Sequence, residues 1–511
     1  MNSIRLHLIC GFITFGLLWM TFHHRRHPVF GFEDLAQVAE HQIPFYSSSY
    51  PELPPFLKNL DYDQTRDIRW KNNLLLWPSP AIPFQARFFH RTGKQSQRID
   101  IYSLHGSQID HVLYSPSQFD FGKNKIPVEN IPADLGYSGF RLHYPLNRKD
   151  YLDEFLVFLG GSYFRSLGKN QHYGLSARAL AINPGLSDTA EEFPSFTRFW
   201  IREPERTSDS IQILALLESP SATGAYEFVT SPGDETKIEV HAKIFVHQKI
   251  KRLAIAPISS MYWFGENSRM QINDFRPEVH DSDGLLIQNG KEEWLWRPLS
   301  NSPNAQENSF QDQNLHGFGL LQRDRDFQNY QDLEAHYHER PSLWIQPKGN
   351  WNAGAVQLIQ WPTKNEYQDN ILACWMLTSV EPKTVLDIRY TMYWFGDHEH
   401  RPPLGRCTQT RIHYPVGAEP PLFVVDFSNH GLENIPSDHP PQVEVTANIE
   451  NIVQKTLLQP NQPGQGWRVT FEIDPTKIEG KPVELRCCLR DEHKPLTETW
   501  TYTWSPPRSS K

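Results

Sequence analysis

One segment of regular alternation constrains the fold more than any other feature of this sequence. Residues 236–246 read Thr-Lys-Ile-Glu-Val-His-Ala-Lys-Ile-Phe-Val, with apolar side chains at every second position from Ile238 to Ile244. Successive side chains of a strand point to opposite faces, whereas an α-helix requires a period of about 3.6 residues. The segment is therefore predicted to be an antiparallel strand with one face in a core and the other toward solvent.

Similar apolar runs, bounded by turn residues, recur along the chain and predict further strands. They span residues 211–217, 225–230, 253–258, 355–360 and 385–394. The 40 prolines, 30 phenylalanines, 19 tyrosines and 15 tryptophans also suit short strands joined by many loops. A short helix is expected at 32–41. We therefore expect an all-β protein whose main part is a large β-sandwich over residues 31–397.

A second, smaller domain is expected at the C-terminus. Residues 398–420, rich in Pro, Gly, His and charged residues, separate two strand-rich regions and are interpreted as a linker. Beyond the linker, the predicted strands span 422–427, 442–447, 467–473, 482–489 and 498–504. Five short strands in fewer than a hundred residues predict an immunoglobulin-like sandwich over residues 421–511.

The N-terminus predicts export from the cytoplasm. Residues 8–22 form an apolar run after Arg5, too short for an ordinary membrane span but suited to the core of a signal peptide. No small-x-small cleavage site follows, and Arg25 and Arg26 lie immediately beyond the run. Residues 1–30 are therefore either a cleaved signal peptide or an uncleaved membrane anchor, and the folded body is expected outside the cytoplasm.

Charge and motifs exclude several classes of function. The formal net charge is −9 and no stripe of Lys and Arg stands out, which argues against nucleic acid as a partner. The sequence has no G-x-S-x-G, P-loop or G-x-G-x-x-G motif, so acyl transfer, NTP hydrolysis and nicotinamide chemistry lack support. Histidines two apart, which share a strand face, occur at His336 and His338 and again at His398 and His400, but outside any recognised zinc pattern. Neither a metal nor another cofactor is expected.

Aromatic residues between 281 and 370 are candidates for binding a sugar. Sugar rings present flat apolar faces edged with hydroxyl groups, so a glycan site needs exposed aromatic side chains beside polar ones. The candidates are Trp294, Trp296, Arg297, Tyr330, Trp344, Lys348 and Trp351. Trp294 and Trp296 would share one face of a strand. The alternative is that each tryptophan belongs to the core.

Hydrolysis of a glycosidic bond requires two carboxyl groups, one protonated and one ionised. Candidate pairs are Asp281 with Asp283, Asp324 with Asp326, and Glu366 with Asp369. The residues alone do not select a pair. Asp324 and Asp326 alternate with Arg323 and Arg325, which indicates an ion-pair ladder as the simpler interpretation.

Several ordered blocks of sequence resemble the periplasmic glucan biosynthesis protein G/D family. They include Asp134-Leu-Gly-Tyr-Ser-Gly-Phe, Arg276-Pro-Glu-Val-His-Asp-Ser-Asp-Gly-Leu, Glu293-Trp-Leu-Trp-Arg-Pro-Leu, Gly317-Phe-Gly-Leu-Leu-Gln-Arg and Pro347-Lys-Gly-Asn-Trp. The resemblance extends from about residue 30 to the end. It implies a large N-terminal sandwich like that of galactose mutarotase and a C-terminal immunoglobulin-like domain.

The resemblance also implies a function. It implies a periplasmic role in making osmoregulated glucans with a β-1,2-linked backbone, with glucan as partner and the inner-membrane glucan synthase as a further candidate. Asp369 matches the general acid of the family, Asp281 the other catalytic carboxylate, and Glu366 a nearby acidic residue. Asn365, Tyr367 and Asp324 depart from the usual Asp, Thr and Gly. Two hypotheses remain: an endo-acting β-1,2-glucan hydrolase or transglycosylase, and a non-catalytic module that holds nascent glucan for branching or modification.

Overall fold

Strands dominate the computed structural model, as the sequence predicts. It describes residues 29–42, 52–77, 79, 81–268, 273–398, 401–413, 420–478, 482–492 and 494–505, so the apolar run at 8–22 lies outside the described residues. No helix in these ranges is long and apolar enough to cross a membrane. The α-helices are α1 (Phe32–His41), α2 (Pro55–Lys58), α3 (Tyr62–Arg66) and α4 (Phe327–Tyr330).

A ten-stranded sheet forms one layer of the large sandwich. In spatial order it contains β2 (Gln85–His90), β6 (Tyr137–Tyr144), β7 (Asp153–Leu159), β8 (Tyr163–Ser166), β9 (Ser176–Arg178), β15 (Ile250–Ser260), β24 (Ile371–Val380), β23 (Gly354–Gln360) and β20 (Gln306–Asp312), with β10 (Leu180–Ile182) also paired to β15. Two short ladders lie outside the large sheets. They pair β1 (Arg69–Trp70) with β5 (Phe119–Asp120) and β16 (Tyr262–Phe264) with β17 (Val279–His280).

A fourteen-stranded sheet forms the other layer and continues into the C-terminal part. Its order is β28 (Gln442–Ala447), β31 (Val483–Arg490), β32 (Thr499–Trp504), β19 (Trp294–Pro298), β18 (Gly284–Gln288), β21 (Gly317–Leu321), β22 (Ser342–Lys348), β25 (Val385–Phe395), β14 (Thr236–Val246), β13 (Ala222–Ser231), β12 (Ile211–Glu218), β11 (Ser195–Arg202), β3 (Asp100–His105) and β4 (Gln108–His111). The alternating segment forms β14 and lies between two antiparallel neighbours, as predicted.

The core of the large sandwich lies between these two sheets. Phe158 of the ten-stranded sheet contacts Phe199 and Phe228 of the fourteen-stranded sheet, with ring centroids 5.3 and 5.2 Å apart. On the opposite face of the fourteen-stranded sheet, α1 covers Leu214 and Leu216 of β12. Both faces of β12 are therefore buried, which explains why its sequence is apolar at nearly every position.

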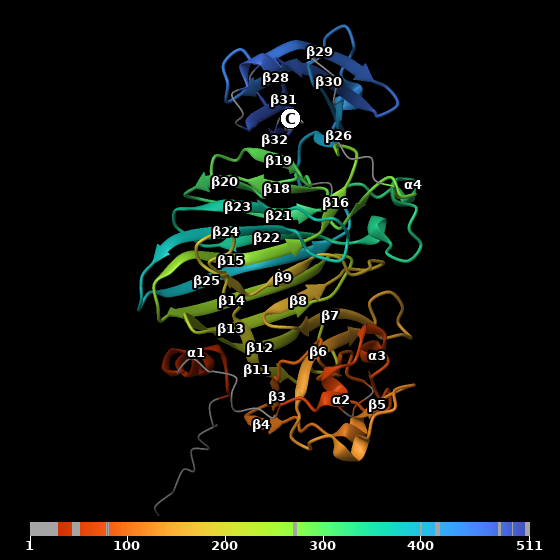
Figure 1. Cartoon of the computed structure of the whole chain (residues 1–511), viewed down its shortest axis with the longest axis vertical. Coiled ribbons are helices and arrows are strands. Elements are labelled where there is room, and N and C mark those ends of the chain that lie inside the picture. Colours follow the sequence, from red (N-terminus) through yellow and green to blue (C-terminus); the bar gives the residue numbers. More distant parts are fainter. Residues whose placement is uncertain are drawn as a thin grey trace, which may run out of the picture.

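The C-terminal part is a second sandwich that shares a sheet with the first. A four-stranded sheet of β26 (Arg406–His413), β27 (Leu422–Ser428), β30 (Gly466–Ile473) and β29 (Val453–Asn461) packs against the end of the fourteen-stranded sheet. Figure 1 shows these blue strands at one end of the long axis. The junction is the parallel pair β19–β32, in which Trp296 lies beside Trp500. Strand β26 lies inside the segment 398–420 that we interpreted as a linker, and it pairs with β27. The strand was not expected there because its residues are mostly polar and show no apolar pattern.

Candidate active site

A two-residue stretch of backbone, Met261–Tyr262, holds Asp281 and Asp369 close together. Asp281 directly follows β17, and its backbone N–H donates to the carbonyl oxygen of Met261 at 2.8 Å. Asp369 precedes Asn370, whose side chain accepts from the Tyr262 N–H at 2.8 Å and donates to the Tyr262 carbonyl at 3.0 Å. The proximity of the two carboxyl groups follows from this shared support.

The two carboxyl groups have different surroundings. Asp281 is buried, with 4% of its surface exposed, and forms an ion pair with Arg340. The Arg340 guanidinium also lies 4.2 Å from the centre of the Tyr337 ring. Asp369 keeps part of its surface open to solvent. The surrounding protein atoms, and after them the negative charge of Asp281, nevertheless raise the pKa of Asp369 above its usual value.

Glu366 belongs to a group of ion pairs that we call the Arg276 hub: Asp274, Arg276, Asp332 and Glu366. The guanidinium of Arg276 lies 2.9 Å from Asp274, 2.9 Å from Asp332 and 2.7 Å from Glu366. Tyr337 donates its hydroxyl proton to Glu366 at 2.5 Å. Tyr337 therefore contacts both the hub and Arg340, and so it connects Glu366 to the ion-pair partner of Asp281.

Two arginines near Asp369 were not singled out from the sequence. Arg178 and Arg165 both act to lower the pKa of Asp369, and so oppose the effect of burial. Arg178 is buried, pairs with Glu191 at 2.6 Å, and lies between the rings of Tyr163 and Phe193, about 5.0 Å from each centroid. The signal that could have found them is the resemblance to the family, because both lie in matching blocks of sequence, Gly161-Ser-Tyr-Phe-Arg and Tyr173-Gly-Leu-Ser-Ala-Arg.

The predicted sugar-binding tryptophans do not form an exposed platform. Trp294, Trp296 and Trp344 are 9%, 3% and 3% exposed and pack in the core that joins the two sandwiches. Glycines make room for them: a Cβ atom on Gly284 would lie 2.4 Å from Trp296, and one on Gly317 would lie 2.2 Å from Trp344. The alternative interpretation, that these side chains are core, fits their burial.

The other predicted binding residues are also engaged within the protein. Arg297 is buried and pairs with Glu484 of β31 at 2.8 Å. Tyr330 is fully buried beside Tyr337, and Trp351 packs on Tyr390. Lys348 is exposed and pairs with Glu239 at 3.0 Å. The structure thus brings together Asp281, Asp369 and Glu366, whereas the seven predicted binding residues lie in the core or in ion pairs.

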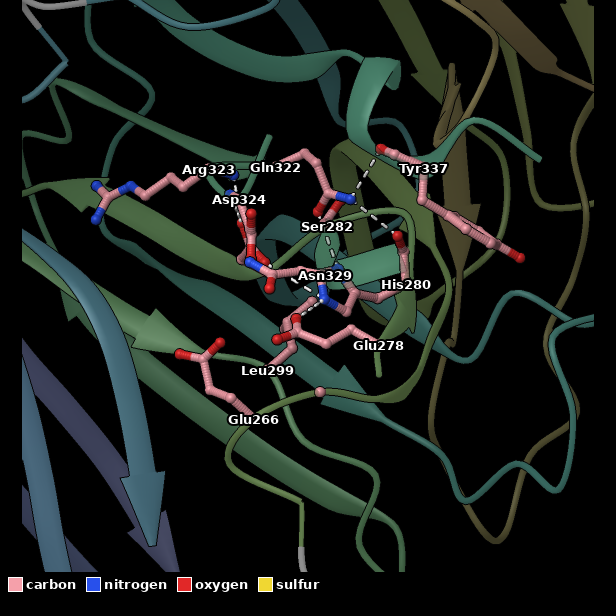
Figure 2. Close-up of polar contacts among 12 residues, drawn as sticks. Glu266, Glu278, His280, Ser282, Leu299, Gln322, Arg323, Asp324, Asn329 and Tyr337 are labelled. Carbon is pink, nitrogen blue, oxygen red and sulfur yellow. Dashed lines mark hydrogen bonds and ion pairs between the residues drawn. The ribbon is translucent and has the colours of Figure 1, made fainter. Parts of the chain in front are cut away.

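Beside this site lies what we call the interdomain cluster: Glu266, Glu278, His280, Asp283 and Asp324. Figure 2 labels Glu266, Glu278, His280 and Asp324. His280 lies 2.8 Å from Glu278 and 3.5 Å from Asp283. Asp283 accepts the backbone N–H groups of Arg323 and Asp324, and Glu266 accepts that of Thr410 in β26. The cluster therefore ties the large sandwich to the C-terminal one.

An ion pair completes this junction. Arg323 contacts Glu498 through two bonds of 2.5 and 2.9 Å, and its guanidinium lies 3.6 Å above the ring of Trp296. Glu498 is 1% exposed and also accepts the backbone N–H of Cys407 at 2.8 Å. Trp296, predicted as a sugar platform, instead stacks on an arginine between the two sandwiches.

The charges of the interdomain cluster perturb one another. Burial lowers the pKa of His280, but Asp283 and Glu278 outweigh burial and raise it to about 9. Burial, followed by the charge of Asp283, raises the pKa of Asp324 to about 6. Burial also raises the pKa of Glu266 and of Asp283. Protonation within the cluster is therefore favoured over full ionisation.

Three groups of side chains bring potential metal ligands within 4.8 Å of one another in the described ranges. They are His172, His336 and Glu339; Glu278, His280 and Asp283; and Glu266, Glu278 and Asp324. Of the histidines considered from the sequence, only His336 belongs to such a group there, and His400 lies outside the described residues. Ion pairs of Glu339 with His172 and His336, and of His280 with Glu278 and Asp283, account for the contacts within the first two groups.

The buried side chain of Gln322 joins the two sites. Its amide donates to the carbonyl oxygens of His280 and Tyr337 at 2.9 and 3.1 Å, and its oxygen lies 3.0 Å from the His280 ring. His280 precedes Asp281, and Tyr337 bonds Glu366. Gln322 therefore fixes the distance between the segment that carries Asp281 and the segment that carries Tyr337, the hydrogen-bond partner of Glu366 (Figure 2).

Comparison with known proteins identifies the family. The family model described as "Periplasmic glucan biosynthesis protein, MdoG" matches residues 30–504. The chain belongs to this family. A glucans biosynthesis protein G from Ralstonia nicotianae is 40% identical over 488 residues, which cover 93% of this chain and 96% of that protein. A probable glucans biosynthesis protein D from Shewanella oneidensis is 41% identical, with coverages of 90% and 86%. The resemblance recognised from sequence blocks is confirmed, and both G and D proteins of the periplasmic glucan biosynthesis family are similar to this chain.

Proposed function

We propose that this protein acts in the periplasm in glucan synthesis, where it cleaves or transfers β-1,2-linked glucan chains. The family and the names of its relatives support the role in glucan synthesis. The observation that carries the catalytic part is the pair Asp281 and Asp369, two carboxyl groups on one backbone support with unequal surroundings. Glycosidic bond cleavage requires such a pair, one protonated and one ionised.

In this proposal Asp369 is the general acid. Its raised pKa favours the protonated form, and its open side allows it to approach the leaving glycosidic oxygen. Asp281 carries the negative charge, balanced by Arg340, and activates the water or sugar hydroxyl that attacks. Glu366, held by Arg276 and Tyr337, positions the loop that carries Asp369.

The test is the replacement of Asp369 by Asn, which keeps the shape and removes the proton. Purified wild-type protein, Asp369→Asn and the control Asp234→Asn, whose side chain is 91% exposed, are incubated with linear β-1,2-glucan, and the products are sized. We expect Asp369→Asn to lose activity by about a hundredfold or more, because general acid catalysis contributes about that much.

Product sizes also separate hydrolysis from transfer, since transfer yields chains longer than the substrate. Near-wild-type cleavage by Asp369→Asn would overturn the assignment of the acid. If the wild-type protein binds glucan but yields no product, the non-catalytic module that holds nascent glucan replaces the enzyme.

A further inference from the structure

The three most exposed large apolar side chains of the described residues all adjoin the Arg276 hub. Tyr367, Leu333 and Phe275 are 85%, 79% and 78% exposed. Tyr367 follows Glu366, Leu333 follows Asp332, and Phe275 precedes Arg276. We call these three residues the apolar rim. Single exposed apolar residues are ordinary on a protein surface, but such a group around one charged centre calls for a function.

The hub fixes the positions of the rim residues. The Arg276 guanidinium lies 5.9 Å from the centre of the Phe275 ring and contacts Asp332 at 2.9 Å. Phe275 and the residue before Leu333 therefore both lie close to one ion-paired side chain. Arg276, Asp332 and Glu366 are themselves mostly covered, with side-chain exposures of 10%, 13% and 21%.

Tyr367 lies on a loop that is anchored at several points. The Trp361 N–H bonds the Asn370 carbonyl at 2.9 Å and closes the loop between β23 and β24. The Asn365 side chain accepts the Tyr367 N–H at 3.1 Å. Glu366 is held by the hub, and Asn370 is held by Tyr262. The backbone of Tyr367 is thus fixed, two residues from Asp369, while its ring stays open to solvent.

We propose that the apolar rim and the Arg276 hub form a subsite for glucose units of a glucan chain next to Asp369. Glucose combines apolar ring faces with hydroxyl edges, and the rim provides separate apolar surfaces around a charged centre. The donors of Arg276 are used within the hub, but Asp332 Oδ2 and Glu366 Oε1 each accept only one bond there, so the remaining lone pair of each would accept a sugar hydroxyl proton. A large contiguous apolar patch, which would instead mark a protein partner, is not needed for a sugar chain.

This subsite rests on the proposed function, since the subsite would bind the glucan chain that Asp369 cleaves. The rim takes the place that the sequence suggested for the tryptophans of β19 and β22, which are buried. Because an aromatic ring on a fixed backbone loses little entropy on binding, Tyr367 is expected to contribute most.

Equilibrium binding of linear β-1,2-glucan tests the subsite without turnover in an Asp369→Asn background. Tyr367→Ala, Phe275→Ala and Leu333→Ala are compared with Tyr62→Ala and Leu113→Ala, controls of similar exposure that lie outside the hub (67% and 69% exposed). We expect Tyr367→Ala to weaken binding about five- to tenfold and the other two rim variants less, with controls unchanged. Melting temperatures should stay equal throughout, because these side chains are exposed.

The outcomes separate the two proposals. If the background protein binds glucan and the rim variants bind as the controls do, the subsite is refuted and the proposed function stands. If the background protein binds no glucan, the substrate in the proposed function is refuted, and the subsite with it. A rim variant that lowers the melting temperature as much as the affinity would assign the rim a structural role instead.

Discussion

Residues 278–283 contribute to two regions in which buried charges have different partners. Asp281 belongs to the candidate active site with Asp369, whereas Glu278, His280 and Asp283 belong to the interdomain cluster. In the cluster every one of these three groups has a hydrogen-bond or ion-pair partner within 3.5 Å. At the other site, Asp281 has Arg340, but no described side chain forms an ion pair or hydrogen bond with Asp369.

The difference indicates a division of roles. Satisfied buried charges resist change and hold two parts of a protein in one arrangement, whereas an open carboxyl group with a raised pKa is free to meet a substrate. Of the two regions, the interdomain cluster should therefore govern stability, and the Asp281–Asp369 site should govern activity.

The largest effect is expected for Glu498→Ala at the interdomain junction. Removal of this carboxylate leaves Arg323 buried without its charge partner, so the free energy of unfolding should fall by about 3–5 kcal/mol. The control Glu239→Ala removes the exposed partner of Lys348 and should cost at most about 1 kcal/mol. Urea unfolding measures both. Equal losses in the two variants would contradict the special role of the junction, as would reduced activity in the remaining folded Glu498→Ala protein.

A smaller effect is expected from pH. The pKa of His280 is raised in the folded state from 6.5 to about 9, so its stabilising contribution is complete below pH 6.5 and is lost as the pH rises through about 9. The wild-type protein should lose about 3 kcal/mol of unfolding free energy over this range. In His280→Gln this loss should disappear, although the variant is less stable overall. An unchanged slope in the variant would place the titrating group elsewhere.

The smallest effect, and the one that couples the two regions, is expected for Gln322→Met. Methionine has a similar shape but cannot bridge His280 and Tyr337, so Asp281 and Glu366 lose their fixed spacing. We expect kcat on β-1,2-glucan to fall about tenfold with little change in KM, as for a lost positioning contact. Gln346→Met on β22 is the control, because Gln346 is exposed. If kcat stays unchanged, the two sites are independent.

Much of the fold could be predicted because the strands carry their own patterns. The helix at 32–41 has the bounds of α1, and the alternating segment at 236–246 has the bounds of β14. Strand β29 was not predicted: six of its nine residues are polar or proline, and most of its side chains are exposed, so no apolar periodicity marks it. Strand β26, which lies in the expected linker, was not predicted for the same reason: no apolar periodicity marks it.

The candidate site divides in the same way between predictable and unpredictable parts. Asp281, Asp369 and Glu366 were assigned because they match single positions of the family, and the structure brings them together. The tryptophans of β19 share one strand face, as expected, but the C-terminal sandwich covers that face, a long-range contact that no local pattern reports. The apolar rim lies in loops, where a single exposed Phe, Leu or Tyr has no periodic neighbours to distinguish it from a core residue.

The sheet that runs through both sandwiches has a consequence for how the chain folds. Thr501 of β32 donates a hydrogen bond to Trp296 of β19 across 205 residues of sequence. Such distant pairing slows folding, because a long stretch of chain must be closed before the contact forms. Until β32 pairs with it, β19 presents an unpaired edge beside apolar side chains, which favours aggregation. A chain in which β32 has not yet paired is thus a vulnerable intermediate, and assistance from a chaperone would be most valuable just before β32 docks.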